Sequence, residues 1–362
     1  LTDLSDRLQM FLVYRSNTGC NTIWCYSSFC VFAQKHKIVD NPNQRKLQKH
    51  PVPLLGGYAI ALAMIMPIIV SALTLGWTRW YIPVIFVIFA LIIGLLDDIY
   101  ELSARIRFGV EIILVGLYIW LSHSLIGNIY GLWGIEHMSS WIAVPLSIVA
   151  GVGIINSINL IDGIDGYSSG FGILGCSLFG IFFISIQDWP LAGFMLIVAA
   201  AIVPFFCYNV FSKNKKMFIG DGGTLMIGAI MTVTIFHILS PNSIGTEFVQ
   251  KGMGLVAFCL AVVCIPVFDT VRVMCERILR KTSPFTADKT HLHHLFLEHQ
   301  FSHLQTTFCI LCINLLIVGI WYVSYRLALN IDIQLYIVVG LGILSTFGLS
   351  AYLRRKNKHK SS

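Results

Sequence analysis

The sequence predicts an all-α, polytopic integral membrane protein, and three features of its composition support this fold class. Only 12% of the 362 residues are charged, whereas soluble globular proteins carry about 25%. Hydrophobic residues make up 56% of the chain, and its mean hydropathy is +0.76. So few charges cannot cover the surface of a soluble fold. The same composition excludes a disordered protein and a small disulfide scaffold.

Apolar segments long enough to cross a bilayer recur along the whole chain. A membrane-spanning helix needs about 20 mostly apolar residues. Ten segments fulfil this, at 53–75, 80–96, 106–122, 140–161, 168–187, 190–208, 217–239, 253–275, 306–328 and 331–352. A weaker one lies at 10–33, where a secretory signal is an alternative that lacks a basic start and a clean apolar core. We expect about 10–11 transmembrane helices in a single transmembrane domain over 1–362, with an atypical N-terminal segment at 1–34.

The positions of the basic residues predict how the chain is oriented. If the loop at 34–52 is cytoplasmic and the sides alternate from there, 20 of the 25 Lys and Arg residues are cytoplasmic. Only Arg79 and Lys251 fall on the other side. This asymmetry follows the positive-inside rule and places the C-terminus in the cytoplasm. The basic clusters also suit contact with anionic lipid headgroups.

The few acidic residues gather in three short motifs. Asp97 and Asp98 are adjacent, Asp162 and Asp165 belong to the string Asn-Ser-Ile-Asn-Leu-Ile-Asp-Gly-Ile-Asp-Gly, and Asp221 belongs to Gly-Asp-Gly-Gly. The expected topology puts all five at cytoplasmic helix ends. One Asp at a helix end is an ordinary cap, but clustered carboxylates repel one another unless a cation neutralises them. Hard oxygen ligands favour Mg²⁺ or Mn²⁺ over Zn²⁺.

A second polar feature is the loop at 276–305, which we expect to be cytoplasmic. Five of the 11 His residues lie within it, beginning with His291-Leu-His293-His294. A Zn²⁺ site is one interpretation, but Cys ligands and a zinc-finger spacing are missing. Imidazoles beside Arg and Lys are better suited to an anionic substrate such as a diphosphate and its sugar hydroxyls. Plain loop polarity is a third interpretation.

One acidic residue falls inside an expected span. A carboxylate within the membrane costs roughly 2.5–3.5 kcal/mol on insertion scales, so Glu111 should be paired or protonated. We expect it to have a structural partner. The Cys309-x-x-Cys312 pair also lies within a span, where core packing is a better interpretation than a redox or metal pair.

Taken in order, these motifs resemble those of the polyprenyl-phosphate N-acetylhexosamine-1-phosphate transferases, glycosyltransferase family 4. The motifs are Asp97-Asp98, the string 156–166, Asn209 with Phe218-Ile-Gly-Asp221, and His291-Leu-His293-His294. The segments Asp40-Asn-Pro-Asn-Gln-Arg45-Lys46 and Pro53-Leu-Leu-Gly56-Gly57 are similar to the family's first cytoplasmic loop. The resemblance covers about residues 35–350. Together with Ser283-Pro284-Phe285, the His motif looks more like the undecaprenyl-phosphate GlcNAc-1-phosphate branch than the MurNAc-pentapeptide branch.

The resemblance implies a reaction and its setting. UDP-GlcNAc and undecaprenyl phosphate would give undecaprenyl-diphosphate-GlcNAc and UMP, with Mg²⁺ or Mn²⁺, in the bacterial inner membrane. This step would begin a lipid-linked polysaccharide of the O-antigen or enterobacterial common antigen type. Membrane lipids would be partners and nucleic acid would not, and a homodimer is compatible with the family. Another UDP-HexNAc donor or UDP-MurNAc-pentapeptide remains an alternative. So does a transporter, although a transporter should place its ionisable groups near the bilayer midplane.

The resemblance also suggests roles for individual residues. Asp97, Asp98, Asp165 and Asp221 would be catalytic, and Asp221, with Asp97 and Asp98, would bind the metal. The substrate-binding set would be Asn159, Asp162, Asn209, Phe218, Arg277, His291, His293, His294 and Lys46. Within that set, Phe218 would stack on uracil, and Arg277 and the His residues would contact phosphate and the N-acetyl sugar. Direct attack by the lipid phosphate and a covalent Asp intermediate both remain open.

Overall fold

A computed structural model describes residues 35, 39–40, 52–75, 81–212, 216–241, 252–284 and 288–360. The expected weak span at 10–33 and the predicted phosphate contact Lys46 lie outside these residues. The chain forms two compact units. Unit 1 comprises residues up to Arg107 together with Ser168–Ile227, and unit 2 comprises Phe108–Tyr167 together with the residues from Gly228 onward. Each unit is described by itself.

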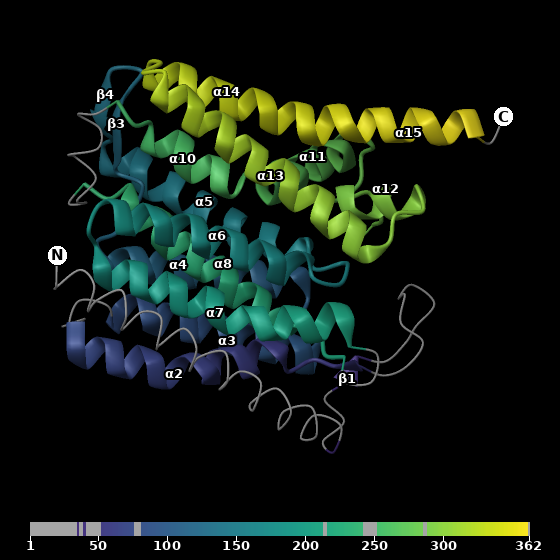
Figure 1. Cartoon of the computed structure of the whole chain (residues 1–362), viewed down its shortest axis with the longest axis horizontal. Coiled ribbons are helices and arrows are strands. Elements are labelled where there is room, and N and C mark those ends of the chain that lie inside the picture. The colour runs from purple at the N-terminus through teal and green to yellow at the C-terminus, as the bar shows by residue number, and fades with distance from the viewer. Residues whose placement is uncertain are drawn as a thin grey trace. The chain divides into compact units, whose positions relative to one another are not determined.

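Unit 1 is built from helices that follow a short two-stranded sheet. Its elements are β1 (Val39–Asp40), β2 (Val52–Pro53), α2 (Gly56–Leu75), α3 (Tyr81–Tyr100), the start of α4 (Ala104–Ser122), α6 (Tyr167–Ser185), α7 (Trp189–Phe211) and the first half of α8 (Gly220–Ile238). The two strands are antiparallel, with Val39 opposite Pro53. Helix α2 lies alongside α7 (Figure 1). The strands therefore lead directly into α2, and the Asp97–Asp98 motif lies at the end of the next helix, α3.

Unit 2 contains most of the C-terminal half of the chain. Its elements are the remainder of α4 and α8, β3 (Asn128–Leu132), β4 (Ile135–His137), α5 (Ser140–Leu160), α10 (Leu255–Val262), α11 (Cys264–Leu279), α12 (Leu292–Glu298), α13 (His303–Arg326), α14 (Ile331–Ile343), the π-helical turn η1 (Leu344–Gly348) and α15 (Leu349–Lys360). The last three continue one another as a single long helix beside α13 (Figure 1). The short helix α12 contacts both α13 and α15.

The predicted all-α polytopic fold is confirmed. Among the described residues, seven helices are long and apolar enough to cross a membrane, and a bent helix pair makes an eighth if it counts as one span. Helices α2 and α4 occupy two further segments predicted from the sequence. Helix α4 carries two Arg residues and Glu111, so its apolar character is weaker. The buried carboxylate of Glu111 accepts a hydrogen bond from the Asn156 side chain, which is the kind of structural partner we expected.

The bent pair lies where the sequence suggested one span at 253–275. Helices α10 and α11 meet at Val263 with a bend of 74°, and Pro266 stands in the first turn of α11, where its missing amide and fixed φ are tolerated. The break leaves backbone groups without helical partners. The Asn314 side chain, buried on α13, accepts from Ile265 N at 3.0 Å and donates to Val262 O at 3.0 Å and Ala261 O at 3.4 Å. In a membrane such groups must be satisfied within the protein.

We therefore predict that Asn314→Leu destabilises unit 2. Each buried backbone group left unpaired costs about 1–3 kcal/mol, so the midpoint of thermal unfolding in detergent should fall clearly. Ser324→Ala on the same helix is the control, because the Ser324 hydroxyl only donates to the carbonyl of Trp321 within α13. Equal unfolding midpoints for the two variants would contradict this role of Asn314.

Candidate active site

The predicted site residues fall into two sets, one in each unit. In unit 1, Asp97, Asp98, Arg107 and Asp221 form what we call the carboxylate cluster. In unit 2, His291, His293 and His294 with Asp269 and Arg272 form the histidine cluster. The packing of the helices and loops that carry these residues determines how close their side chains lie.

Close helix packing positions the carboxylate cluster. A Cβ atom on Gly94 of α3 would lie 2.4 Å from Gly222 Cα, and one on Gly57 of α2 would lie 2.3 Å from Gly223 Cα. Only glycine permits such an approach. Gly220 also has φ of +71°, and a Cβ there would meet Leu54 O and Asp98 Oδ2. The glycines of the Gly-Asp-Gly-Gly motif thus bring the start of α8 against α2 and α3.

Asp98 closes this arrangement by capping α8. Its Oδ1 accepts a hydrogen bond from Asp221 N at 2.9 Å, and its Oδ2 accepts one from Gly222 N at 3.2 Å. The first amides of a helix have no intrahelical acceptors, and the positive end of the helix dipole favours a carboxylate there. Asp98 therefore fixes the backbone on which Asp221 stands.

The Arg107 guanidinium lies close to both Asp97 and Asp221. Asp97 is buried, and its Oδ2 lies 2.7 Å from Arg107 Nη1, which is 4.0 Å from Asp221 Oδ2. The side chain of Asp221 is 38% exposed. In this cluster, three Asp side chains share one guanidinium, so acidic groups outnumber basic ones. A cation or a positively charged group of a complex would be stabilised there.

The cluster suits a metal that is shared with a substrate. Within the part of the chain that the structure describes, no group of three or more His, Cys, Asp or Glu residues is arranged to hold a metal by itself. Mg²⁺ commonly takes one or two carboxylates and completes its shell with water and substrate phosphates. Asp221 fits that use best, because Asp97 faces Arg107 and Asp98 is engaged by the α8 amides.

The segment before α8 holds two predicted substrate contacts. Phe218 is fixed through its backbone, since its N–H donates to Pro53 O at 2.8 Å and its carbonyl accepts from Gly56 N at 3.0 Å. Lys216 Nζ lies 5.7 Å from the centre of the Phe218 ring. Asn209 is buried and donates to Met217 O at 2.9 Å. Asn209 therefore shapes this segment, and Phe218 presents a half-buried aromatic ring beside a cation.

In unit 2, the acidic string at the end of α5 is tied to the start of α13. His303 Nδ1 lies 2.9 Å from Asp165 Oδ2, and the Thr307 hydroxyl donates to Asp165 O at 2.9 Å. Asp162 is exposed and Asn159 is half-buried. The structure thus brings Asp165 to a His residue that we did not assign to the site. Asp162 and Asn159 are the more accessible members of the string.

The three histidines of the predicted motif lie together. The His291 and His293 rings stack with centroids 5.8 Å apart, and the His293 and His294 centroids are 4.2 Å apart. His293 is buried, and neither of its ring nitrogens has a hydrogen-bond partner among the residues that the structure describes. A Cβ on Gly163 would lie 2.1 Å from His293 Nε2. The Asp-Gly-Ile-Asp string and the histidine motif, far apart in sequence, therefore meet within unit 2.

Burial determines the charge of two of these histidines. Burial lowers the pKa of His293 well below its ordinary value, and the nearby His294 and His291 add to this effect. Burial, together with His291 and Lys289, lowers the pKa of His294 to about 4. Both rings are therefore neutral at pH 7 and can accept or donate a hydrogen bond without carrying a charge.

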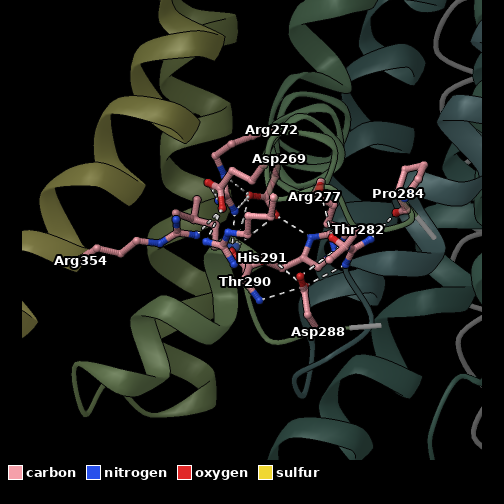
Figure 2. Close-up of polar contacts among 12 residues, drawn as sticks. Asp269, Arg272, Arg277, Thr282, Pro284, Asp288, Thr290, His291 and Arg354 are labelled. Atoms are coloured by element: carbon pink, nitrogen blue, oxygen red, sulfur yellow. Dashed lines mark hydrogen bonds and ion pairs between the residues drawn. The ribbon is translucent and has the colours of Figure 1, made fainter. Parts of the chain in front are cut away.

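Arg277, a predicted substrate contact, makes its hydrogen bonds within the loop before α12. Its guanidinium donates to both oxygens of Asp288, at 2.8 and 3.2 Å, and to Pro284 O at 2.6 Å (Figure 2). Burial alone would raise the pKa of Asp288, but hydrogen bonds from Arg277 and Thr290 hold that pKa well below its ordinary value. In this structure Arg277 therefore stabilises the loop before α12.

Several residues in or beside the two clusters were not predicted from the sequence. Arg107 and Arg272 were read only as topology signals, and Asp269 and His303 were given no role. A spacing signal existed for Arg272, because Asp269 and Arg272 are three residues apart and share a helix face. Arg107 and His303 pair with residues of other elements, and such pairing has no local sequence signal.

Comparison with known proteins shows which family the chain resembles. Residues 80–239 match glycosyl transferase family 4. The chain is 28% identical to the probable undecaprenyl-phosphate N-acetylglucosaminyl 1-phosphate transferase of Bacillus subtilis, over 76% of this chain and 74% of that protein. It is also 28% identical to the undecaprenyl-phosphate alpha-N-acetylglucosaminyl 1-phosphate transferase of Escherichia coli K12, over 80% of this chain and 78% of that protein.

The middle of the chain, residues 80–239, is therefore similar to glycosyl transferase family 4. A third relative, the decaprenyl-phosphate N-acetylglucosaminephosphotransferase of Mycobacterium leprae, is 27% identical over 75% of this chain and 73% of that protein. The family match includes the whole carboxylate cluster and the acidic string at the end of α5. This protein is therefore an enzyme of the glycosyl phosphotransferase class, as the resemblance implied.

The neutral histidines generate a prediction about pH and stability. A His residue whose pKa falls from about 6.5 in the unfolded chain to about 4 when folded binds more protons in the unfolded state. Stability is therefore fully present above pH 6.5 and is lost as the pH falls toward 4. We expect the unfolding midpoint in detergent to drop between pH 7 and pH 4.5, and to drop less in His294→Gln. An identical pH dependence for both proteins would contradict the assignment.

Proposed function

We propose that this protein transfers GlcNAc-1-phosphate from UDP-GlcNAc to undecaprenyl phosphate. The products would be undecaprenyl-diphosphate-GlcNAc and UMP. The observation that carries the proposal is the carboxylate cluster, in which a helix start presents Asp221 beside Arg107 and Asp97. The names of the relatives support the polyprenyl phosphate acceptor and the GlcNAc group.

The proposed chemistry exchanges one phosphoanhydride bond for another. An oxygen of the lipid phosphate attacks the sugar-bearing phosphorus of UDP-GlcNAc and forms a new P–O bond. The bond from that phosphorus to the bridging oxygen breaks, and UMP leaves with this oxygen. Because bonds of similar energy form and break, the enzyme mainly has to position the phosphates and neutralise their charge.

The carboxylate cluster is suited to this task. Mg²⁺ or Mn²⁺, bound by Asp221, would neutralise the donor diphosphate and the charge that develops on it. Arg107, oriented by Asp97, would face the same negative charge. Asp98 keeps α8 and hence Asp221 in place. Phe218 with Lys216 offers a flat ring and a cation for the uracil nucleotide.

The histidine cluster would serve the sugar-phosphate side. His291 Nε2 is buried and finds no hydrogen-bond partner in the described ranges, and His294 is half-buried and neutral at pH 7. Both rings can hydrogen-bond phosphate or sugar hydroxyl groups. Asn159 and Asp162 remain proposed contacts for the nucleotide or the metal.

The contacts of the carboxylate cluster favour direct attack by the lipid phosphate. A phosphate is already ionised at neutral pH and needs little help from a general base. Asp97 is neutralised by Arg107, and both oxygens of Asp98 accept backbone hydrogen bonds. These contacts weaken either carboxylate as a covalent nucleophile.

The setting of the reaction is part of the proposal. The enzyme would lie in a bacterial inner membrane with its active site and C-terminus in the cytoplasm, where UDP-sugars are found. Its product would begin a lipid-linked polysaccharide such as O-antigen or enterobacterial common antigen. The orientation follows from the 20 basic residues that the expected topology places on one side.

The test is UMP release by the purified protein in detergent. We expect release only when UDP-GlcNAc, undecaprenyl phosphate and Mg²⁺ or Mn²⁺ are all present, and much slower release with UDP-Glc or UDP-MurNAc-pentapeptide. No UMP from the complete mixture would refute the proposed function. Incorporation of labelled UMP into UDP-GlcNAc without lipid would instead indicate a covalent intermediate and refute direct attack.

A further inference from the structure

A line of alternating charges runs through unit 2 from the C-terminal helix to the histidine cluster. Arg354 Nη2 lies 2.7 Å from Glu276 Oε2, and Glu276 Oε1 lies 2.7 Å from Arg272 Nη1. Arg272 Nη2 lies 2.7 Å from Asp269 Oδ1, and Asp269 Oδ2 lies 2.9 Å from His291 Nδ1. Figure 2 shows Arg354, Arg272, Asp269 and His291 converging from α15, α11 and the loop before α12.

The ion pair between Arg272 and Asp269 in this line is buried, so each charge needs the other for stability. Arg272 is 0% exposed and Asp269 is 2% exposed. A buried charge that loses its partner destabilises a protein strongly. Asp269 accepts from the Arg272 guanidinium, His291 Nδ1 and Leu292 N. With both oxygens engaged, this carboxylate is poorly placed to bind a metal or accept a proton from substrate.

What Asp269 does control is the orientation of His291. A carboxylate accepts hydrogen bonds, so His291 Nδ1 carries the proton and Nε2 is the nitrogen left for a ligand. His291 Nε2 is buried and has no hydrogen-bond partner within the described part of the chain. Arg272 Nη2 also donates to Thr290 O at 2.7 Å, which fixes the backbone next to His291.

At the other end of the line, α15 contacts both α11 and the end of α12. Arg354 reaches Glu276, and His299 Nε2 lies 2.9 Å from Leu353 O. Two neighbouring residues of α15 therefore hold α11 and the end of α12. The basic C-terminal helix was expected only to set topology and to contact anionic lipid.

We propose that Asp269 and Arg354 are positioning residues, and that α15 holds the His291 ring in place through Glu276 and Arg272. Neither residue would touch substrate. The catalytic part of this inference rests on the proposed transferase function, in which His291 contacts the donor.

Arg355 provides a matched control for Arg354. It is the next residue of the same helix, has the same charge, and is exposed. It makes no ion pair with any residue that the structure describes. Arg354→Gln and Arg355→Gln remove the same charge from the same surface, so a lipid contact would be weakened equally by both. Only Arg354→Gln breaks the contact with Glu276.

The experiment measures UMP release by the full-length variants in nanodiscs of fixed lipid composition. We expect Arg354→Gln to lower kcat by about tenfold, and Asp269→Asn by about 10- to 100-fold, the range typical of residues that orient a functional histidine in metal sites. KM for undecaprenyl phosphate should change little. Arg354→Lys should recover most of the activity, and Arg355→Gln should match the wild type. Equal kcat for Arg354→Gln and Arg355→Gln would overturn the proposal.

A second readout does not depend on activity. Hydrogen–deuterium exchange of the backbone over residues 288–300 should be faster in Arg354→Gln than in Arg355→Gln or the wild type. Equal exchange in the two variants refutes the positioning role whether or not the protein is active. An inactive wild type with faster exchange in Arg354→Gln alone would refute the transferase function and retain the structural link. If Asp269→Asn fails to fold, Glu276→Gln at the outer edge of the line provides the same test.

Discussion

The cap that Asp98 places on α8 is the interaction on which the proposed site depends. A helix start exposes amides that need acceptors, and here the acceptor is a carboxylate from α3. This single side chain fixes the position of Asp221, the close packing of Gly94 on Gly222, and the approach of Asp221 to Arg107. Without the cap, α8 would begin with unpaired amides, and Asp221 would lose its defined place in the cluster.

Other carboxylates in the chain are also held by hydrogen-bond donors, in these cases from Arg and His side chains. A carboxylate that is buried in a largely apolar protein needs hydrogen-bond donors around it to remain stable. Asp97 has Arg107, Asp269 has Arg272 and His291, and Asp288 has Arg277. The acidic residues therefore serve two purposes. Some hold helices and loops together, and Asp221, partly exposed at a helix start, remains suited to an external cation.

The sequence was sufficient to predict the fold class and the acidic and histidine motifs, because the fold class depends on composition and the motifs are local. Arg107, Asp269 and Arg272 complete the two clusters through contacts of the folded chain, and the sequence did not assign them to a site. The capping role of Asp98 was not predictable, since its partners are amides 123 and 124 residues away. The bend at Val263 was missed because the hydropathy of the segment stays high through the break. The backbone groups that the break leaves unpaired are hydrogen-bonded by Asn314 of α13, which only the folded structure shows. Arg277 was assigned to substrate, but its partners Asp288 and Pro284 became evident only from the folded loop.

The division of labour between Asp98 and Asp221 is the central claim, and one paired measurement tests it directly. It compares UMP release and the thermal unfolding midpoint of Asp98→Asn and Asp221→Asn with those of the wild type. The account predicts that Asp221→Asn keeps the wild-type midpoint and loses about 100-fold or more in kcat, as expected when a metal-binding carboxylate is removed. Asp98→Asn should lower both the midpoint and the activity. Full activity in Asp221→Asn, or an unchanged midpoint in Asp98→Asn, would contradict the account.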